Sequence, residues 1–260
     1  MEPPVLGTPP APASDERGAP PPTVGPASLP AAAGTEARTT ATAWAATALG
    51  VLLLIGGLAG ADRALYVHVC QRINTADTAQ RDINDLYQRT KPLWMLARFA
   101  VQFVGVATLA WLAVTQAARR RAVLAAAITV AFVAGGANVL QMAIGRARPN
   151  AAASQWTFFA PFSGLTHAHP DGFPSGEVAA AFAFAAVLVR VASPSGGRAL
   201  PTRGSALPLY GLATLTALAR WLPGMHYLSD VAAGALLGAW LGDATCGWLQ
   251  RRLFVQPRTN

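Results

Sequence analysis

One histidine and one aspartate near the C-terminus have the types and spacing of a nucleophile and the residue that orients it. Pro223-Gly224 interrupts a helical pattern, and His226 then begins a new helix. Asp230 follows four residues later, so both side chains lie on one helix face. The carboxylate can accept a hydrogen bond from one imidazole nitrogen and leave the other free to attack. The alternative is that His226 caps a helix and Asp230 makes an ordinary polar contact.

Two arginines and one helix start indicate that the target of this attack is an anion. Arg148 and Arg220 carry planar guanidinium groups that match phosphate oxygens, although either one alone could be a topology signal. Ser175-Gly176 precedes an apolar run, so backbone N–H groups and the helix dipole point into the same space. Gly176 also permits close approach, while a plain N-cap is the simpler interpretation of this pair.

The elements that position these residues are apolar helices. Of the 260 residues, 53% are hydrophobic and 12% are charged, whereas a soluble domain has about 25% charged residues. The composition predicts an all-α membrane protein, a bundle of six transmembrane helices. We expect these helices at residues 43–61, 93–115, 122–144, 176–192, 207–222 and 227–248. The last three are rich in Ala and Gly, which lets neighbouring helices approach closely.

Two other parts of the chain lack such apolar runs. Residues 1–40 hold ten of the twenty prolines and predict a disordered tail. The membrane domain then covers residues 41–250, and residues 251–260 form a basic C-terminal tail. Within the domain, residues 63–91 mix arginines with aspartates and predict a polar loop with an interfacial helix.

The basic charge of the chain could bind nucleic acid or anionic lipid. The formal net charge is +8, and every basic residue except Lys91 is Arg. These arginines stand singly or in short clusters between apolar runs, without the basic and aromatic interleaving of nucleic-acid sites. We therefore exclude nucleic acid and expect the bilayer and a lipid as partners. Cys70 and Cys246 fall at opposite membrane faces, so we expect no disulfide between them.

The short loops set the orientation, because Arg and Lys concentrate on the cytoplasmic side. Three basic groups fall on one side of the predicted bundle: Arg119 to Arg121, then Arg190, Arg198 and Arg203, then Arg251, Arg252 and Arg258. The candidate site falls on the other side. We therefore predict a multi-pass protein of a bacterial inner membrane with its site on the periplasmic face.

These clusters together resemble the type 2 phosphatidic acid phosphatase superfamily, which also contains vanadium-dependent haloperoxidases. The resemblance covers roughly residues 43–248. The family signature has three parts: Lys-x6-Arg-Pro, then Pro-Ser-Gly-His, then Ser-Arg-x5-His-x3-Asp. This chain has the same order and spacing in Gln141-x6-Arg148-Pro149, Pro174-Ser175-Gly176-Glu177 and Ala219-Arg220-x5-His226-x3-Asp230.

The chain departs from this signature at three positions. Gln141 replaces Lys and removes a positive charge, which neighbouring Arg146 could supply. Ala219 replaces Ser, a smaller loss. Glu177 replaces the His that in the family protonates the leaving alkoxide. We expect Glu177 to take over this acid role, with the bound phosphate favouring its protonated form, while His167 and His169 are the next candidates.

The resemblance implies a phosphatase in which His226 attacks phosphorus, Asp230 orients it and Glu177 acts as the acid. It implies that the phosphate oxygens bind to Arg148, Arg220, Ser175, Gly176 and Gln141. No metal ion or cofactor is implied, because fixed cations and backbone dipoles stabilise the transferring group. The substrate would be a lipid phosphate or an isoprenoid diphosphate.

Two alternatives to a phosphatase remain open. A lipid phosphotransferase would resolve the phosphohistidine with a second lipid hydroxyl instead of water. A catalytically impaired relative would only bind or move phospholipid, as the missing Lys, Ser and His suggest. The sequence leaves the oligomeric state open.

Overall fold

The described part of the protein is helical, which confirms the predicted all-α class. The computed structural model describes residues 45–72, 81–149, 154, 156–162, 172–192 and 203–254. Within these ranges the extended structure is limited to one isolated bridge between Arg146 and Phe158. The predicted N-terminal tail, most of the C-terminal tail, His167 and His169 lie outside the described residues.

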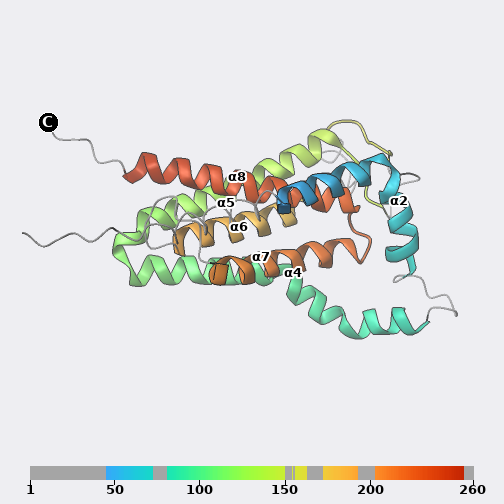
Figure 1. The fold of residues 1–260 in the computed structure, drawn as a ribbon, viewed down its shortest axis with the longest axis horizontal. Helices are drawn as coiled ribbons and strands as arrows, with labels where there is room; N and C mark the ends of the chain where they lie inside the picture. Colours follow the sequence, from blue (N-terminus) through green and yellow to red (C-terminus); the bar gives the residue numbers. More distant parts are fainter. Residues whose placement is uncertain are drawn as a thin grey trace, which may run out of the picture.

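The helices follow the apolar runs of the sequence closely. A first helix spans Ala45–Gln71 and includes the short segments η1 (Gly57–Ala61), α2 (Asp62–Leu65) and η2 (Tyr66–Gln71). The longer helices are α4 (Arg81–Thr115), α5 (Arg120–Ile144), α6 (Gly176–Ala192), α7 (Arg203–Trp221) and α8 (Leu228–Phe254), and the short turn η4 (Ala117–Arg119) joins α4 to α5. In Figure 1 the long helices run side by side along the longest axis of the molecule.

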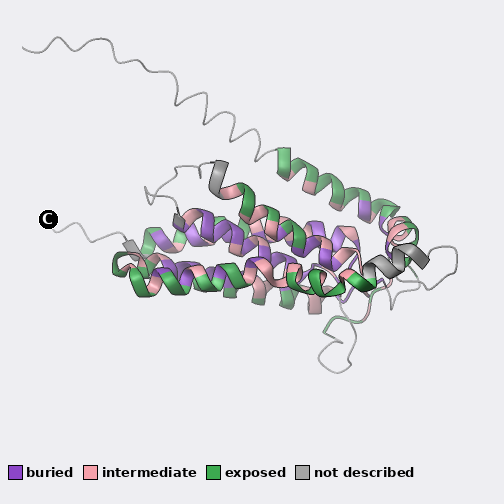
Figure 2. Cartoon of the chain, turned by 90° about the horizontal axis from the view of Figure 1, so that it is seen from below, coloured by how far each residue is buried: buried purple, intermediate pink, exposed green. Residues whose placement is uncertain are grey.

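Helix α6 forms the centre of the bundle. It packs against α4, α5, α7 and α8, and Figure 2 shows buried residues concentrated along the inner helices. Most of its side chains are small or β-branched, and Val178, Ala179, Ala183 and Val187 are fully buried. Small side chains allow the four surrounding helices to approach, so α6 fixes the positions of the elements that carry the site.

The contact between α6 and α8 depends on three glycines at four-residue spacing, Gly234, Gly238 and Gly242. A Cβ atom at Gly234 would lie 2.5 Å from the carbonyl oxygen of Ser175, and one at Gly242 would lie 3.0 Å from Cα of Ala183. Because these neighbours are backbone atoms, they cannot rotate away. The expected close approach of Gly-rich helices is therefore present here.

The outer faces of the first helix, α4 and α5 are apolar, as expected for lipid contact. Large exposed side chains include Leu52, Phe103, Trp111 and Phe132. Among the described residues, three helices are long and apolar enough to cross a membrane: Ala45–Gln71, Gln88–Thr115 and Ala117–Ile144. The predicted count of six spans is therefore not confirmed, because α6, α7 and α8 do not stand out by length and composition.

The described parts of residues 63–91 are helical, where the sequence predicts a polar loop with an interfacial helix. The first helix continues to Gln71, and α4 already begins at Arg81. Arg, Leu and Gln are good helix formers, so polar residues need not end a helix. The first helix instead changes direction at Gly60, whose φ of 134° suits glycine. Beyond this break Asp62 is 1% exposed.

Candidate functional site

His226 lies in the connection between α7 and α8 with its ring 2% exposed. Its Nδ1 lies 2.8 Å from the carbonyl oxygen of Gly172, and its Nε2 lies 3.3 Å from Nη2 of Arg220. A carbonyl only accepts and a guanidinium only donates, so these partners assign the proton to Nδ1 and the lone pair to Nε2. Nε2 is therefore the atom that can attack.

Two successive hydrogen bonds of the loop backbone hold the His226 ring in place. The N–H of Gly172 donates to the carbonyl of Arg146 at 2.6 Å, and the Gly172 carbonyl then accepts from His226. Gly224 precedes the histidine with a φ of 71°, and a Cβ atom there would lie 2.7 Å from the ring of Tyr66. Glycine at this turn lets the first helix pack directly beneath the histidine loop.

Asp230 faces His226, but its hydrogen bonds go elsewhere. Its Oδ2 lies 3.7 Å from Nδ1 of His226, which is too long for a hydrogen bond. The same oxygen accepts the backbone N–H of Tyr227 at 2.8 Å, so Asp230 caps the start of α8. The direct hydrogen bond expected from the sequence is replaced by the bond to Gly172, and Asp230 acts on the ring through its charge.

Arg146 supports Asp230 and does not enter the phosphate-binding space, so the expectation that it replaces the missing Lys is wrong. Its Nη1 donates to Asp230 Oδ1 at 2.6 Å and to Ser229 Oγ at 2.7 Å, and its Nη2 donates to Asp62 Oδ2 at 3.0 Å. Asp62 in turn accepts from the N–H and the hydroxyl of Ser229. Burial strengthens these charge-assisted bonds and makes their loss costly.

Glu177, at the position of the family's acid, is engaged in an ion pair. Its Oε2 accepts from Nε of Arg98 at 2.6 Å, its Oε1 accepts from Nη2 of the same arginine, and Nε of Arg220 lies 3.5 Å from Oε2. Arg98 comes from the middle of α4. The carboxylate therefore lies between two guanidinium groups, one of which also contacts His226.

Two buried polar atoms at the same end of the bundle have no hydrogen-bond partner within the described part of the chain. They are Oγ of Ser175 and Nε of Arg220, and these side chains are 0% and 4–5% exposed. Buried polar groups are normally paired, so these two atoms indicate the place of a ligand oxygen near the buried His226. Both residues were expected to bind phosphate.

The other expected phosphate ligands lie around the same end of the bundle. The positive charge of Arg148 acts on both His226 and Arg220. Gly176 begins α6, and a Cβ atom there would collide with the side-chain oxygen of Asn138. Gln141 lies in the last turn of α5, where its carbonyl accepts from the N–H of Gly145 at 3.0 Å. The roles of these three residues stay predictions.

The surroundings favour the neutral form of His226. Burial lowers the pKa of its ring, Asp230 opposes this shift, and the positive charges of Arg220 and Arg148 add to it. The direction follows because a buried imidazolium loses its hydration and faces two cations. A neutral ring with the proton on Nδ1 has the lone pair that a nucleophile needs.

Sequence reasoning missed four residues of this site: Asp62, Arg98, Gly172 and Ser229. Arg98 could have been found, because a single arginine within an apolar run is costly in a membrane and tends to mark function. Asp62 follows the first apolar run and carried a similar signal. Gly172 contributes through its backbone, and Ser229 is one of many serines, so neither had a distinguishing pattern.

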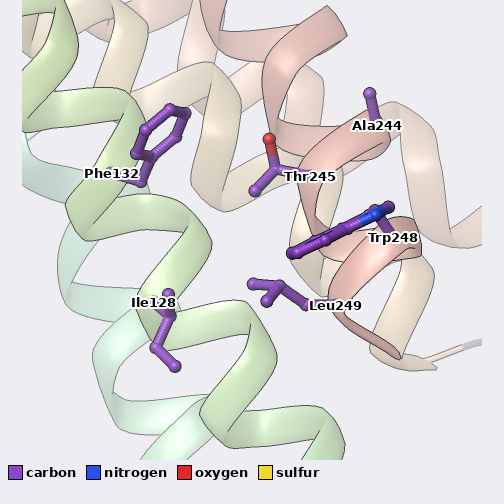
Figure 3. Close-up of a pocket in the computed structure, with 6 residues that line it drawn as sticks. All are labelled: Ile128, Phe132, Ala244, Thr245, Trp248 and Leu249. Carbon is purple, nitrogen blue, oxygen red and sulfur yellow. The ribbon is translucent and has the colours of Figure 1, made fainter. Parts of the chain in front are cut away.

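A separate hollow lies in the opposite half of the bundle. It has a volume of about 470 Å³ and lies between α5 and α8 (Figure 3). Its lining is almost entirely apolar and consists of Ile128, Phe132, Ala244, Thr245, Trp248 and Leu249. The hollow has no titratable side chain and opens on the side where Phe132 and Trp248 are exposed, so it does not belong to the histidine site.

The fold and the site define a helical membrane protein with a buried histidine in contact with a buried arginine. The chain belongs to the PAP2 superfamily, whose sequence model matches residues 121–254, about half of the chain. This membership confirms the resemblance inferred from the three motifs. The match leaves out the first helix and α4, and with them Asp62 and Arg98.

Two curated relatives are similar to the chain. A protein named lipid A 1-phosphatase from Rhizobium johnstonii is 38% identical over 124 residues, which cover 45% of this chain and 43% of the relative. A second lipid A 1-phosphatase, from Rhizobium etli, is 37% identical over 124 residues and is covered to 46%. The chain thus spans less than half the length of these relatives. No solved structure matches the chain.

Proposed function

We propose that the protein is a membrane phosphatase that hydrolyses a lipid phosphate through a phosphohistidine at His226. The observation that carries the proposal is the geometry at Nε2 of His226. This atom bears a lone pair and lies 3.3 Å from Arg220, and beside it Ser175 Oγ and Arg220 Nε are buried without a hydrogen-bond partner in the described structure. The family and the names of both relatives support the same activity.

In the first step Nε2 of His226 attacks phosphorus, and the bond between phosphorus and the lipid oxygen breaks. The electron pair of that bond leaves with the lipid oxygen. Nδ1 keeps its proton, so the phosphorylated ring is a cation. Gly172 accepts from that proton, and Asp230 places a negative charge 3.7 Å away. Arg148, Arg220, Ser175 and the backbone of Gly176 bind the phosphoryl oxygens.

In the second step a water molecule attacks the phosphohistidine. The P–N bond breaks, its electron pair returns to Nε2, and neutral His226 is restored with the proton still on Nδ1. The phosphate leaves with the water oxygen and its protons. A lipid hydroxyl in place of water would give a phosphotransferase, so the acceptor decides between the two activities.

A lipid whose phosphate is attached to a sugar is the first candidate substrate. Both relatives are named for removing the 1-phosphate of lipid A, and the exposed apolar faces of the first helix and α4 fit a substrate that resides in the bilayer. Phosphatidate, phosphatidylglycerol phosphate and isoprenoid diphosphate are the further candidates. The aromatic side chains of Trp156, Phe158 and Phe162 are exposed near the site and suit the lipid interface.

The proposal is tested by phosphate release from a panel of these lipids with purified protein in detergent. We expect release from at least one lipid and none from the His226→Ala variant. A labelled phosphate donor, offered with lipid hydroxyl acceptors, separates hydrolysis from transfer. Binding of the lipids without release or transfer would overturn the proposal in favour of a binding protein.

We also propose six spans with the site on the periplasmic face, which thiol labelling tests. Ala160 lies after α5 near the site, Ala118 lies in the turn between α4 and α5, and both are exposed. In a background without Cys70 and Cys246, we expect an impermeant thiol reagent to label Ala160→Cys in cells with a permeabilised outer membrane. Ala118→Cys should be labelled only after lysis. The reverse pattern would overturn the orientation.

A further inference from the structure

The carboxylate of Glu177, at the family's acid position, forms an ion pair with an arginine. Both oxygens of Glu177 accept hydrogen bonds from Arg98, and Arg220 adds a third positive contact at 3.5 Å. Each bond is charge-assisted, so it depends on the ionised carboxylate. A protonated carboxyl group would turn one oxygen into a donor that faces a guanidinium, which has no acceptor.

Arg98 keeps donors that Glu177 does not use. A guanidinium has five N–H groups, and Glu177 accepts from Nε and Nη2. The side chain of Arg98 is 26% exposed, whereas that of Arg220 is 5% exposed. Side-chain contacts lead from Nε2 of His226 through Arg220 and Glu177 to Arg98. Glu177 and Arg98, with side chains 32% and 26% exposed, are therefore the more accessible end of this series.

We infer that Arg98, held in place by Glu177, binds the leaving group, and that the site favours phosphates whose leaving group departs as an anion. This inference rests on the proposed phosphatase activity. A fixed guanidinium stabilises negative charge on the departing oxygen, where the family's histidine would deliver a proton. Arg98 also returns to the site a positive charge that Gln141 lacks.

The chemistry of this step balances without an acid. Nε2 of His226 forms the new bond to phosphorus, and the bridging oxygen takes the electron pair of the bond that breaks. With a lipid diphosphate, this oxygen leaves as part of a lipid monophosphate anion, whose charge Arg98 pairs. With an alkyl monoester it would leave as an alkoxide, which is a strong base and needs a proton.

The rate of reaction should therefore rise with the acidity of the substrate's leaving group. Lipid diphosphates should react fastest because phosphate is a stable anion. Phosphates on the anomeric carbon of a sugar should follow, because an anomeric hydroxyl is more acidic than an ordinary alcohol. Alkyl monoesters such as phosphatidate should be slowest. An enzyme with a general acid would show smaller rate differences among these substrates, because protonation lets poor leaving groups depart readily.

The first test measures kcat/KM of the unmodified protein for three lipids: an isoprenoid diphosphate, a glycolipid 1-phosphate and phosphatidate. We expect a fall on the order of 100-fold or more from the first to the last, the usual contribution of general acid catalysis. Equal values for the diphosphate and phosphatidate, with activity still dependent on His226, would overturn the inference and leave the phosphatase proposal standing. No release from any lipid would instead reject the phosphatase.

The second test changes the pair. Arg98→Gln should lower kcat/KM for the diphosphate on the order of 100-fold, as for removal of one fixed donor to a developing anion, and affect phosphatidate less. Arg89→Gln, an exposed arginine on the same helix, is the matched control and should change neither. An equal loss on both lipids for Arg98→Gln would show a structural role only and overturn the inference.

The third test restores the family's acid. The double variant Arg98→Gln with Glu177→His removes both partners of the Arg98–Glu177 pair together, so neither is left without the other, while Arg220 loses its 3.5 Å contact with Glu177. We expect phosphatidate hydrolysis to rise about 10-fold or more relative to the diphosphate. Melting temperatures of all variants show whether they are folded. An unchanged ratio in a folded double variant would contradict a leaving-group role for the pair.

Discussion

Replacing His226 with alanine is expected to lower kcat by more than about 1,000-fold on every lipid the protein hydrolyses. The reason is that in the proposed mechanism Nε2 forms the covalent bond to phosphorus, and only the electrostatic binding groups remain without it. Phosphate release measured with equal amounts of purified protein checks this prediction. The affinity for a phosphate analogue should change little, because the proposed phosphate ligands Arg148, Arg220, Ser175 and Gly176 are unchanged.

The pH dependence of kcat/KM in the unmodified protein gives an independent test of the role of His226. Because burial lowers the pKa of His226, its lone pair stays available at neutral and mildly acidic pH. The acid limb of kcat/KM should therefore fall below the ordinary histidine pKa of about 6.5, with activity lost as pH drops through the lowered value. Residual turnover of more than a few per cent in a folded His226→Ala variant would reject the histidine as nucleophile.

Replacing Gly238 with alanine is expected to lower the melting temperature by about 10 °C or to prevent accumulation of folded protein. A Cβ atom at this position would overlap the carbonyl oxygen of Ala179 and lie 2.9 Å from Cβ of Phe182. One of these contacts is backbone, so relief requires α8 to move away from α6. Thermal unfolding in detergent, followed by the loss of a monodisperse peak, measures the effect.

Gly211 provides the matched control for this prediction. It lies exposed on α7, and a Cβ atom there would meet nothing within 4 Å. Gly211→Ala should therefore leave the melting temperature unchanged or raise it slightly, since alanine favours helix more than glycine does by about 1 kcal/mol. Equal effects of the two substitutions would show that helix propensity decides, and that the close contact of α6 and α8 does not.

Hydropathy alone located the long helices with good accuracy. The predicted segments 122–144 and 176–192 correspond to α5 and α6, because apolar runs bounded by charge or proline mark helix ends. The same reasoning ended the first helix too early, at residue 61. Asp62 continues the helix because its charge is paired with Arg146 from another part of the chain, and hydropathy does not contain such pairings.

The motif residues predicted the end of the bundle where the chemistry lies, and the structure brings His226, Arg220, Glu177 and Ser175 to one place. What could not be predicted is which partner each side chain takes. Arg98 contacts Glu177 across 79 residues of sequence, and a single sequence carries no record of such a contact. Glu177, expected to act as a proton donor, lies in an ion pair with Arg98 in the structure.

The buried network around Arg146 also links the site to the synthesis of the chain. Asp62 is made with the first helix, its partner Arg146 follows after α5, and Ser229 appears only with α8. A nascent first helix thus carries a carboxylate whose buried donors have not yet been translated. A chain that ends before α8 keeps the bond of Asp62 to Arg146 but lacks the two donors from Ser229, so this buried charge is fully paired only once α8 has been made.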